Sequence, residues 1–193
     1  LRLAVLKGRG ANMPADNIQR AIARGTGDGE GASFEELTYE IYGPHGAAIL
    51  CEISTDNRNR TASEIRAILT RNEGKLATAG SVSRLFHRKG QIMIARANAE
   101  EDALMELAIE AGAEDFKVEA EGFEILTAPE DFEAVHKVIE EKEIATESAE
   151  ITALPEITAP VGSEKDLGKV MRLVDLLEDH DDVQAIYSNA ELA

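Results

Sequence analysis

Arginines near the ends of two expected helices are the residues best suited to a chemical task, the binding of phosphate groups. Arg20 and Arg24 are four residues apart, which places both guanidinium groups on one stripe of a helix. Arg58 and Arg60 lie in a polar segment that follows a strand and opens a helix, where free N–H groups also attract anions. Because a guanidinium can donate two parallel hydrogen bonds to a phosphate, these residues predict contact with a polyanion.

The same segment has a structural interpretation. Asp56 and Asn57 can cap the helix, and Arg58 and Arg60 can pair with nearby carboxylates instead of with a ligand. Aromatic residues make up 4% of the chain and do not alternate with basic ones, so a surface that stacks on nucleic-acid bases is not indicated. Backbone phosphates are then the expected contact.

Signals of an enzyme are missing from the sequence. No nucleotide-binding glycine motif follows an expected strand, and His45 and His136 lack metal-ligand spacing. Asp179, Asp181 and Asp182 could hold a divalent cation, although carboxylates at a helix end are typical of a solvated turn. We therefore expect no catalytic activity, no metal and no cofactor.

The charge of the chain is unevenly distributed. The 193 residues include 37 acidic and 20 basic side chains, for a formal net charge of −17. Residues 97–193 carry 27 acidic and six basic side chains, whereas residues 1–26 carry five basic ones against Asp16. Such polarity indicates a cationic contact surface at one end and an acidic surface that repels polyanions. The candidate nucleic-acid-binding residues are Arg2, Lys7, Arg9, Arg20, Arg24, Arg58 and Arg60.

Composition also limits the class of protein. Apolar runs such as residues 47–51 are far shorter than the roughly 20 residues that cross a membrane. The single cysteine, Cys51, can form no intrachain disulfide, and it shares one face of an expected strand with Ile49 and Ile53, which predicts a core position. We expect a cytoplasmic protein without membrane contact.

The periodicity of apolar residues predicts an α+β fold. Residues 12–25 read as a helix that Asn12 caps and Gly25 ends, and Thr61 with Glu64 fits a capping box at the start of a second helix. A later helix over residues 164–178 is expected to bury Met171. Between these helices, strand, helix, strand, strand, helix and strand follow one another from residue 91 to residue 154, the ferredoxin-like order.

One helix and one strand at the C-terminal end cannot bury their own apolar faces. We expect them to complete the sheet begun by the strands near residues 39–42 and 47–54. The predicted domains are the C-terminal part of a small N-terminal helical domain at 1–28, a central α/β domain at 33–89 plus 157–193, and an inserted ferredoxin-like domain at 90–156.

Several blocks of sequence together resemble the YebC/PmpR family, and they run in family order through almost the whole chain. Ile41 and His45 stand where glycines are common in that family, and members usually carry a further basic stretch before the position of Leu1. The blocks are Asn12-Met13-Pro14, Arg20-Ala21-Ile22, Tyr42-Gly43-Pro44, Asp56-Asn57-Arg58-Asn59-Arg60-Thr61, Gly80-Ser81-Val82, Glu110-Ala111-Gly112-Ala113-Glu114-Asp115 and Asp181-Asp182-Val183-Gln184.

The resemblance implies three domains and a role in gene expression, without a catalytic residue set. The family includes proteins described as bacterial transcriptional regulators and the mitochondrial translational activator of cytochrome c oxidase, and bacterial members are linked to ribosomes. The expected function is a transcriptional regulator that binds DNA. One alternative is a ribosome-associated translation factor that binds ribosomal RNA. Another is an adaptor that binds proteins through its acidic C-terminal half and does not touch nucleic acid.

Overall fold

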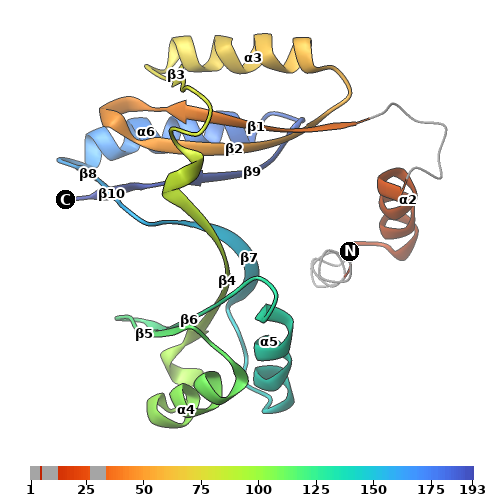
Figure 1. The fold of residues 1–193 in the computed structure, drawn as a ribbon, viewed down its shortest axis with the longest axis vertical. Coiled ribbons are helices and arrows are strands. Elements are labelled where there is room, and N and C mark those ends of the chain that lie inside the picture. The colour runs from red at the N-terminus through yellow and green to blue at the C-terminus, as the bar shows by residue number, and fades with distance from the viewer. Residues whose placement is uncertain (1–4, 6–12, 27–33) are drawn as a thin grey trace.

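The structure, a computed structural model, describes residue 5, residues 13–26 and residues 34–193, and of residues 23–26 it describes the backbone alone. The expected α+β class is confirmed. One helix, α2 (Ala15–Thr26), precedes two units of mixed helix and strand at opposite ends of the molecule (Figure 1). Among the helices in these ranges, none is both long enough and apolar enough to cross a membrane.

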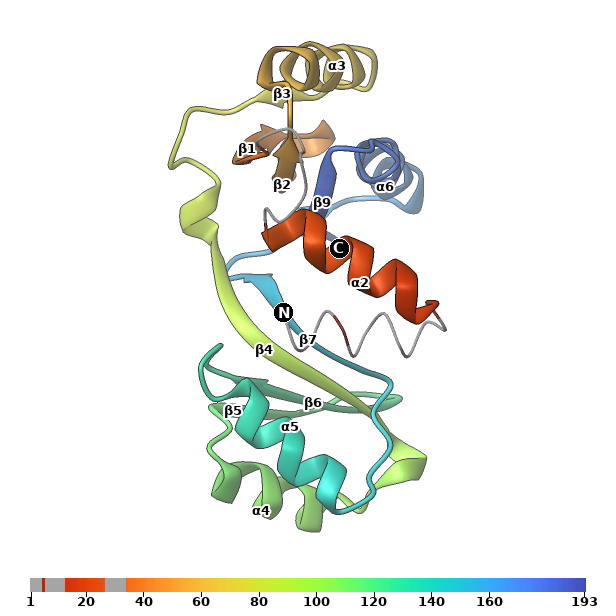
Figure 2. The same cartoon turned by 90° about the vertical axis from the view of Figure 1, so that its right-hand side faces the viewer.

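A four-stranded sheet organises the first of these parts, the central unit. Its strands lie in the order β3 (Lys75–Leu76), β1 (Glu35–Tyr42), β2 (Ala48–Thr55) and β9 (Val183–Ser188). The helices α3 (Arg58–Arg71) and α6 (Glu164–Glu178) pack on one face of this sheet (Figure 2). Because side chains alternate along a strand, every second residue of β2 enters that core.

The core of the central unit confirms the predicted pattern of β2 and the role of the C-terminal elements. Ile49, Cys51 and Ile53 are each at most 2% exposed, and they share this core with Leu69 of α3 and Leu177 of α6. The last long strand, β9, pairs antiparallel with β2. The C-terminal helix and strand thus complete the central sheet, as their unsatisfied apolar faces require.

A small parallel sheet was missed by the sequence-based interpretation. The strands β8 (Ala159–Val161) and β10 (Ala190–Leu192) pair with each other, and β8 contains Pro160. Proline is tolerated there because a strand in a two-stranded sheet needs hydrogen bonds on one side only.

The second part, the inserted unit (residues 90–156), has the predicted ferredoxin-like order. Its sheet places the strands in the order β5-β6-β4-β7, all antiparallel, and both helices lie on the same face of it (Figure 1). The elements in chain order are β4 (Phe86–Ala95), α4 (Glu101–Ala111), β5 (Asp115–Val118), β6 (Gly122–Thr127), α5 (Phe132–Glu141) and β7 (Ser148–Pro155).

Two strands join the units without a break. β4 and β7 pair continuously from Phe86 opposite Pro155 to Met93 opposite Ser148, so the proposed boundary at residues 89–90 falls inside a strand. At Gly90 a Cβ atom would stand 2.2 Å from Oγ1 of Thr127, so only glycine allows β4 to meet β6 here. Whether residues 1–28, 33–89 plus 157–193 and 90–156 fold as separate domains stays a prediction.

A tight turn joins β1 to β2. Residues 44–46 form a short 3-10 helix in which His45 has a φ of 57° and Gly46 a φ of 81°. Both angles lie in the left-handed region that glycine adopts most easily. His45 thus holds a backbone conformation that residues other than glycine seldom adopt.

Three local predictions were wrong. Asn57 caps α3, because its side chain accepts a hydrogen bond from the Arg60 amide at 3.1 Å, so the capping box at Thr61 does not form. Met171 is 46% exposed, and Leu173 enters the core in its place. The third concerns α2, which continues through Gly25 to Thr26, whereas the predicted cap at Asn12 lies outside the described residues.

Candidate nucleic-acid interface

On α2, the structure describes one of the predicted basic side chains. Arg20 donates a hydrogen bond from Nη2 to Oδ1 of Asn17 at 2.6 Å and another from Nε to the carbonyl of Asp16 at 3.3 Å. Both acceptors are neutral, so within the described part of the chain these contacts leave the positive charge of the exposed guanidinium uncompensated. The side chains of Arg2, Lys7, Arg9 and Arg24 lie outside the described residues.

At the start of α3, Arg60 is bound by carboxylates. Its Nη2 donates to Oδ1 of Asp56 at 3.0 Å and to both carboxylate oxygens of Asp182 at 3.2 Å. The hydrogen bond to Asp182 and the charge of that carboxylate raise the pKa of Arg60. Of the two interpretations of this segment, local pairing therefore describes Arg60.

Asp182 forms the centre of this junction, and its side chain is nearly enclosed. The residue is 8% exposed, and its carboxylate accepts hydrogen bonds from Thr61 at 2.6 Å and Thr55 at 3.1 Å. Burial alone would raise the pKa of Asp182, but the hydrogen bonds from Thr61, Arg60 and Thr55 outweigh it, and the pKa falls below its usual value. The network joins α3 and β2 to the segment before β9.

His180 extends the same junction. Its Nδ1 lies 3.1 Å from the Asp182 amide, and its Nε2 lies 2.9 Å from Oε2 of Glu64. The Asp182 carboxylate is occupied by protein donors, which leaves it poorly suited to a cation. Within the described ranges, no group of three or more His, Cys, Asp or Glu side chains is arranged to hold a metal ion.

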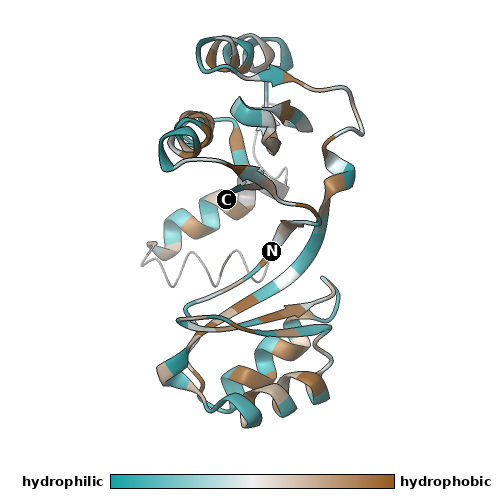
Figure 3. Ribbon diagram, turned by 90° about the vertical axis from the view of Figure 1, so that its left-hand side faces the viewer, coloured by the Kyte–Doolittle hydropathy of each residue, from teal (hydrophilic) through white to brown (hydrophobic). Residues whose placement is uncertain are grey.

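Three exposed arginines of α3 carry positive charge that no described carboxylate neutralises. Arg58, Arg66 and Arg71 are exposed and make no ion pair with any described residue. Within α3 itself there are four arginines, and Glu64 is the single acidic residue. In Figure 3, hydrophilic bands recur along α3 between paler and more hydrophobic ones. These three exposed side chains, Arg58, Arg66 and Arg71, lie at the start, in the middle and at the end of α3, and together they are called the arginine face.

Small side chains separate the arginines on the outside of α3. Helical periodicity places Asn59, Ser63, Ala67 and Thr70 opposite the buried residues. The side chains of Asn59, Ser63 and Thr70 can form hydrogen bonds. Short side chains allow a ligand to approach the helix closely. Sequence reasoning missed Arg66 and Arg71. The helical period of 3.6 residues, with Ile65 and Leu69 facing the core, would have placed both arginines outside the core.

The helices differ in the sign of their net charge. Of the helices with described bounds, the first two are net positive: α2 carries two arginines and one aspartate, and α3 carries four arginines and one glutamate. In contrast, α4 carries four acidic side chains and no basic one, and α5 and α6 are also net negative. Because α3 and α4 lie at opposite ends of the molecule (Figure 1), the described structure is electrically polarised.

A carboxylate also fixes the segment Gly80-Ser81-Val82, which sequence reasoning singled out without a role. Glu40 on β1 accepts hydrogen bonds from the amides of Gly80 and Val82, each at 2.6 Å, and of Ser83 at 2.8 Å. Burial favours a raised pKa for Glu40, but these amides outweigh it and lower the pKa. Glu40 thus anchors the connection that leads into β4.

Comparisons with known proteins agree with this architecture. A family model described as "TACO1/YebC second and third domain" matches residues 34–190. A protein of Elusimicrobium minutum named "Probable transcriptional regulatory protein" is 49% identical over 98% of this chain and 76% of its own length. A protein of Moorella thermoacetica with the same name is 50% identical over 100% of this chain and 77% of its own length.

A solved structure is also similar to this chain in its fold. The crystal structure of a conserved hypothetical protein from Aquifex aeolicus has a TM-score of 0.85 at 42% identity, and it covers 100% of this chain and 79% of that one. Together with the family match over both α/β units, these relatives confirm the resemblance drawn from the sequence blocks. The chain belongs to the TACO1/YebC family.

Proposed function

We propose that this protein regulates gene expression by binding DNA, and that it acts by binding and not by catalysis. The observation that carries the proposal is the arginine face of α3, which is exposed and unpaired among the described residues. The names of the Elusimicrobium and Moorella relatives, which describe probable transcriptional regulatory proteins, support the same role. The five basic side chains in residues 1–26 add to the positive charge.

The geometry of α3 suits contact with a duplex. A rise of about 1.5 Å per residue places Arg58 about 12 Å from Arg66 along the axis and about 20 Å from Arg71. An α-helix can enter the major groove, and arginines along it can reach phosphates on the groove walls. The small outer side chains of α3 would permit that approach. The acidic inserted unit at the other end would limit contact to this part of the molecule.

Salt dependence of binding tests the contact directly. Each phosphate that a cation neutralises adds about 0.9 to the slope of log affinity against log salt concentration on duplex DNA. We expect the double variant Arg66→Ala/Arg71→Ala of the full chain to bind more weakly and with a slope smaller by about two. Fluorescence anisotropy with a labelled duplex, measured at several salt concentrations, provides both values.

A matched control removes the same charge at the other end of the molecule. The variant Lys137→Ala/Lys142→Ala also loses two cations, but from the inserted unit, and it should keep the slope of the unmodified chain. Equal slopes for the two variants would exclude the arginine face as the contact. The RNA alternative is measured in the same assay with an RNA duplex, and tighter binding to RNA would reassign the target. Absence of binding to either polymer at low salt would support the protein-binding adaptor.

A further inference from the structure

A groove crosses the surface of the inserted unit beside α4. It has a volume of about 440 Å³ and lies between α4 and the segment that follows α5. Ala103, Leu104, Leu107 and Ile144 provide its apolar lining. Along α4 the lining residues recur at intervals of three and four from residue 100 to residue 110, so the groove follows the helix for about 15 Å.

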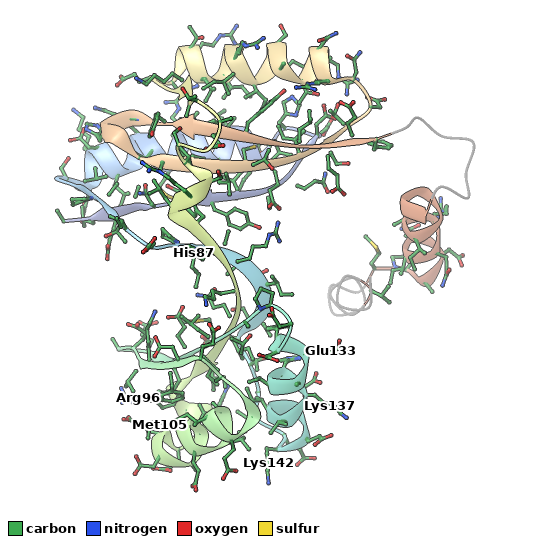
Figure 4. All side chains as sticks on the ribbon, viewed as in Figure 1. His87, Arg96, Met105, Glu133, Lys137 and Lys142 are labelled. Carbon is green, nitrogen blue, oxygen red and sulfur yellow. The ribbon has the colours of Figure 1, made fainter. Side chains whose placement is uncertain are left out.

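Acidic side chains border this apolar lining. Glu106 and Glu110 lie one turn apart on α4, are exposed, and have no ion pair with a described residue. Lys142, labelled near the end of α5 in Figure 4, is the single basic residue of the lining. We call the groove with these residues the α4 groove. Its chemistry is apolar at the base and anionic along one edge.

The surrounding unit strengthens the anionic character. Residues 90–156 contain 19 acidic and four basic side chains, which account for −15 of the total charge of −17. Three of the four basic residues already pair with glutamates inside the unit: Arg96 with Glu101, Lys117 with Glu124, and Lys137 with Glu141. Little internal positive charge remains to neutralise the edge of the groove. A cationic partner would therefore be attracted to this surface and a polyanion repelled.

We propose that the α4 groove binds a cationic amphipathic helix of a partner protein. Apolar side chains of that helix would lie over Leu107 and Ile144, while its lysines or arginines would pair with Glu106 and Glu110. A helix presents apolar residues at intervals of three and four, which match the spacing along α4. The length of the groove corresponds to about ten residues of helix. This site goes beyond the proposed function, because it takes a protein ligand and lies at the end of the molecule opposite the arginine face.

A synthetic peptide tests the proposal with the full-length chain. The probe is a fluorescently labelled helical peptide with leucines at helical spacing on one side and lysines on the other, and its control carries glutamates in place of the lysines. We expect the lysine peptide to bind and the glutamate peptide not to bind. The variant Glu106→Gln/Glu110→Gln should weaken binding by about 3- to 10-fold, the effect of losing two exposed ion pairs.

Two matched controls separate the groove from the general charge of the unit. Glu119→Gln/Glu121→Gln removes the same charge from the β5–β6 turn, and it should change the affinity by less than about twofold. Leu107→Ala should weaken binding, whereas Ile109→Ala, on an exposed and separate side of α4, should not. Circular dichroism spectra establish that each variant is folded before it is compared.

The proposal is overturned by any of three results. The first is equal weakening by both glutamine double variants, which would reflect diffuse attraction alone. The second is no binding of the lysine peptide to the unmodified chain. The third is a dimer in sedimentation that Glu106→Gln/Glu110→Gln dissociates, which would assign the groove to a second copy of this chain. Since none of these measurements involves nucleic acid, they leave the test of DNA binding separate.

Discussion

Asp182 is expected to stabilise the central unit as an ionised, nearly buried carboxylate. The change Asp182→Ala removes the acceptor of two buried hydroxyl groups, those of Thr55 and Thr61, and of the half-exposed Arg60. Hydrogen bonds to a charged group contribute about 1.5–3 kcal/mol each. The two hydroxyls remain 2.8 Å apart and can still pair with each other, which offsets part of the loss. We therefore expect the free energy of unfolding to fall by about 3 kcal/mol.

The milder change Asp182→Asn keeps the shape and removes the charge, so a loss of about 1–2 kcal/mol is expected at neutral pH. Its pH dependence has a definite sign. The pKa of Asp182 is lower in the folded protein than its usual value of 3.8, so the contribution of the carboxylate is complete above that value. It is lost as the pH falls through the lower, folded pKa. The difference between the unmodified chain and Asp182→Asn should therefore be constant near neutral pH and decrease in strong acid.

Urea unfolding followed by tyrosine fluorescence measures this effect in the central unit alone. The chain has three tyrosines and no tryptophan, and Tyr39, Tyr42 and Tyr187 all lie on β1 and β9. Asp181→Asn is the matched control, because Asp181 is exposed beside the network, and a change below about 0.5 kcal/mol is expected. An Asp182→Asn effect equal to that of Asp181→Asn, or one that does not decrease in acid, would refute an ionised carboxylate at the centre of this junction.

Two further outcomes follow from the central unit. Glu40→Gln replaces a carboxylate that accepts hydrogen bonds from three amides by a weaker acceptor. Hydrogen exchange at the amides of Gly80, Val82 and Ser83 should therefore accelerate, by up to about tenfold for each 1.4 kcal/mol lost. Unchanged exchange at these amides would contradict the anchoring role of Glu40. Burial raises the pKa of Cys51 to about 12, so at pH 8 only about one thiol in ten thousand is ionised, and iodoacetamide should label Cys51 only after unfolding; rapid labelling of the folded chain would show that the thiol is accessible.

The sequence alone was sufficient for the order of elements and for the fold class. Periods of two and of 3.6 residues are local properties, so they identified the strand with Ile49 and Cys51 and the exact limits of α6, Glu164–Glu178. The need to bury an isolated helix and strand also identified the return of the C-terminal elements to the central sheet. Short elements were missed, such as β3 and β10, because two or three residues carry too little pattern.

The candidate interface was only partly predictable. Sequence reasoning identified Arg58 and Arg60 from their position at the start of a helix, and it left open whether they meet a ligand or local carboxylates. The structure separates them: Arg58 is exposed without a described partner, while Arg60 pairs with Asp56 and Asp182. It also adds Arg66 and Arg71, which lie outside the polar segment that opens the helix.

Sequence thus determined the class of fold, the order of its elements and the charge carried by each part, because these depend on composition and on neighbours along the chain. The tertiary structure alone decided which charges are neutralised and which remain available. Asp182 and Arg60 are 122 residues apart in the chain and yet share a hydrogen bond. Electrostatic energy depends on separation in space and on burial, and neither quantity can be read from spacing along the sequence.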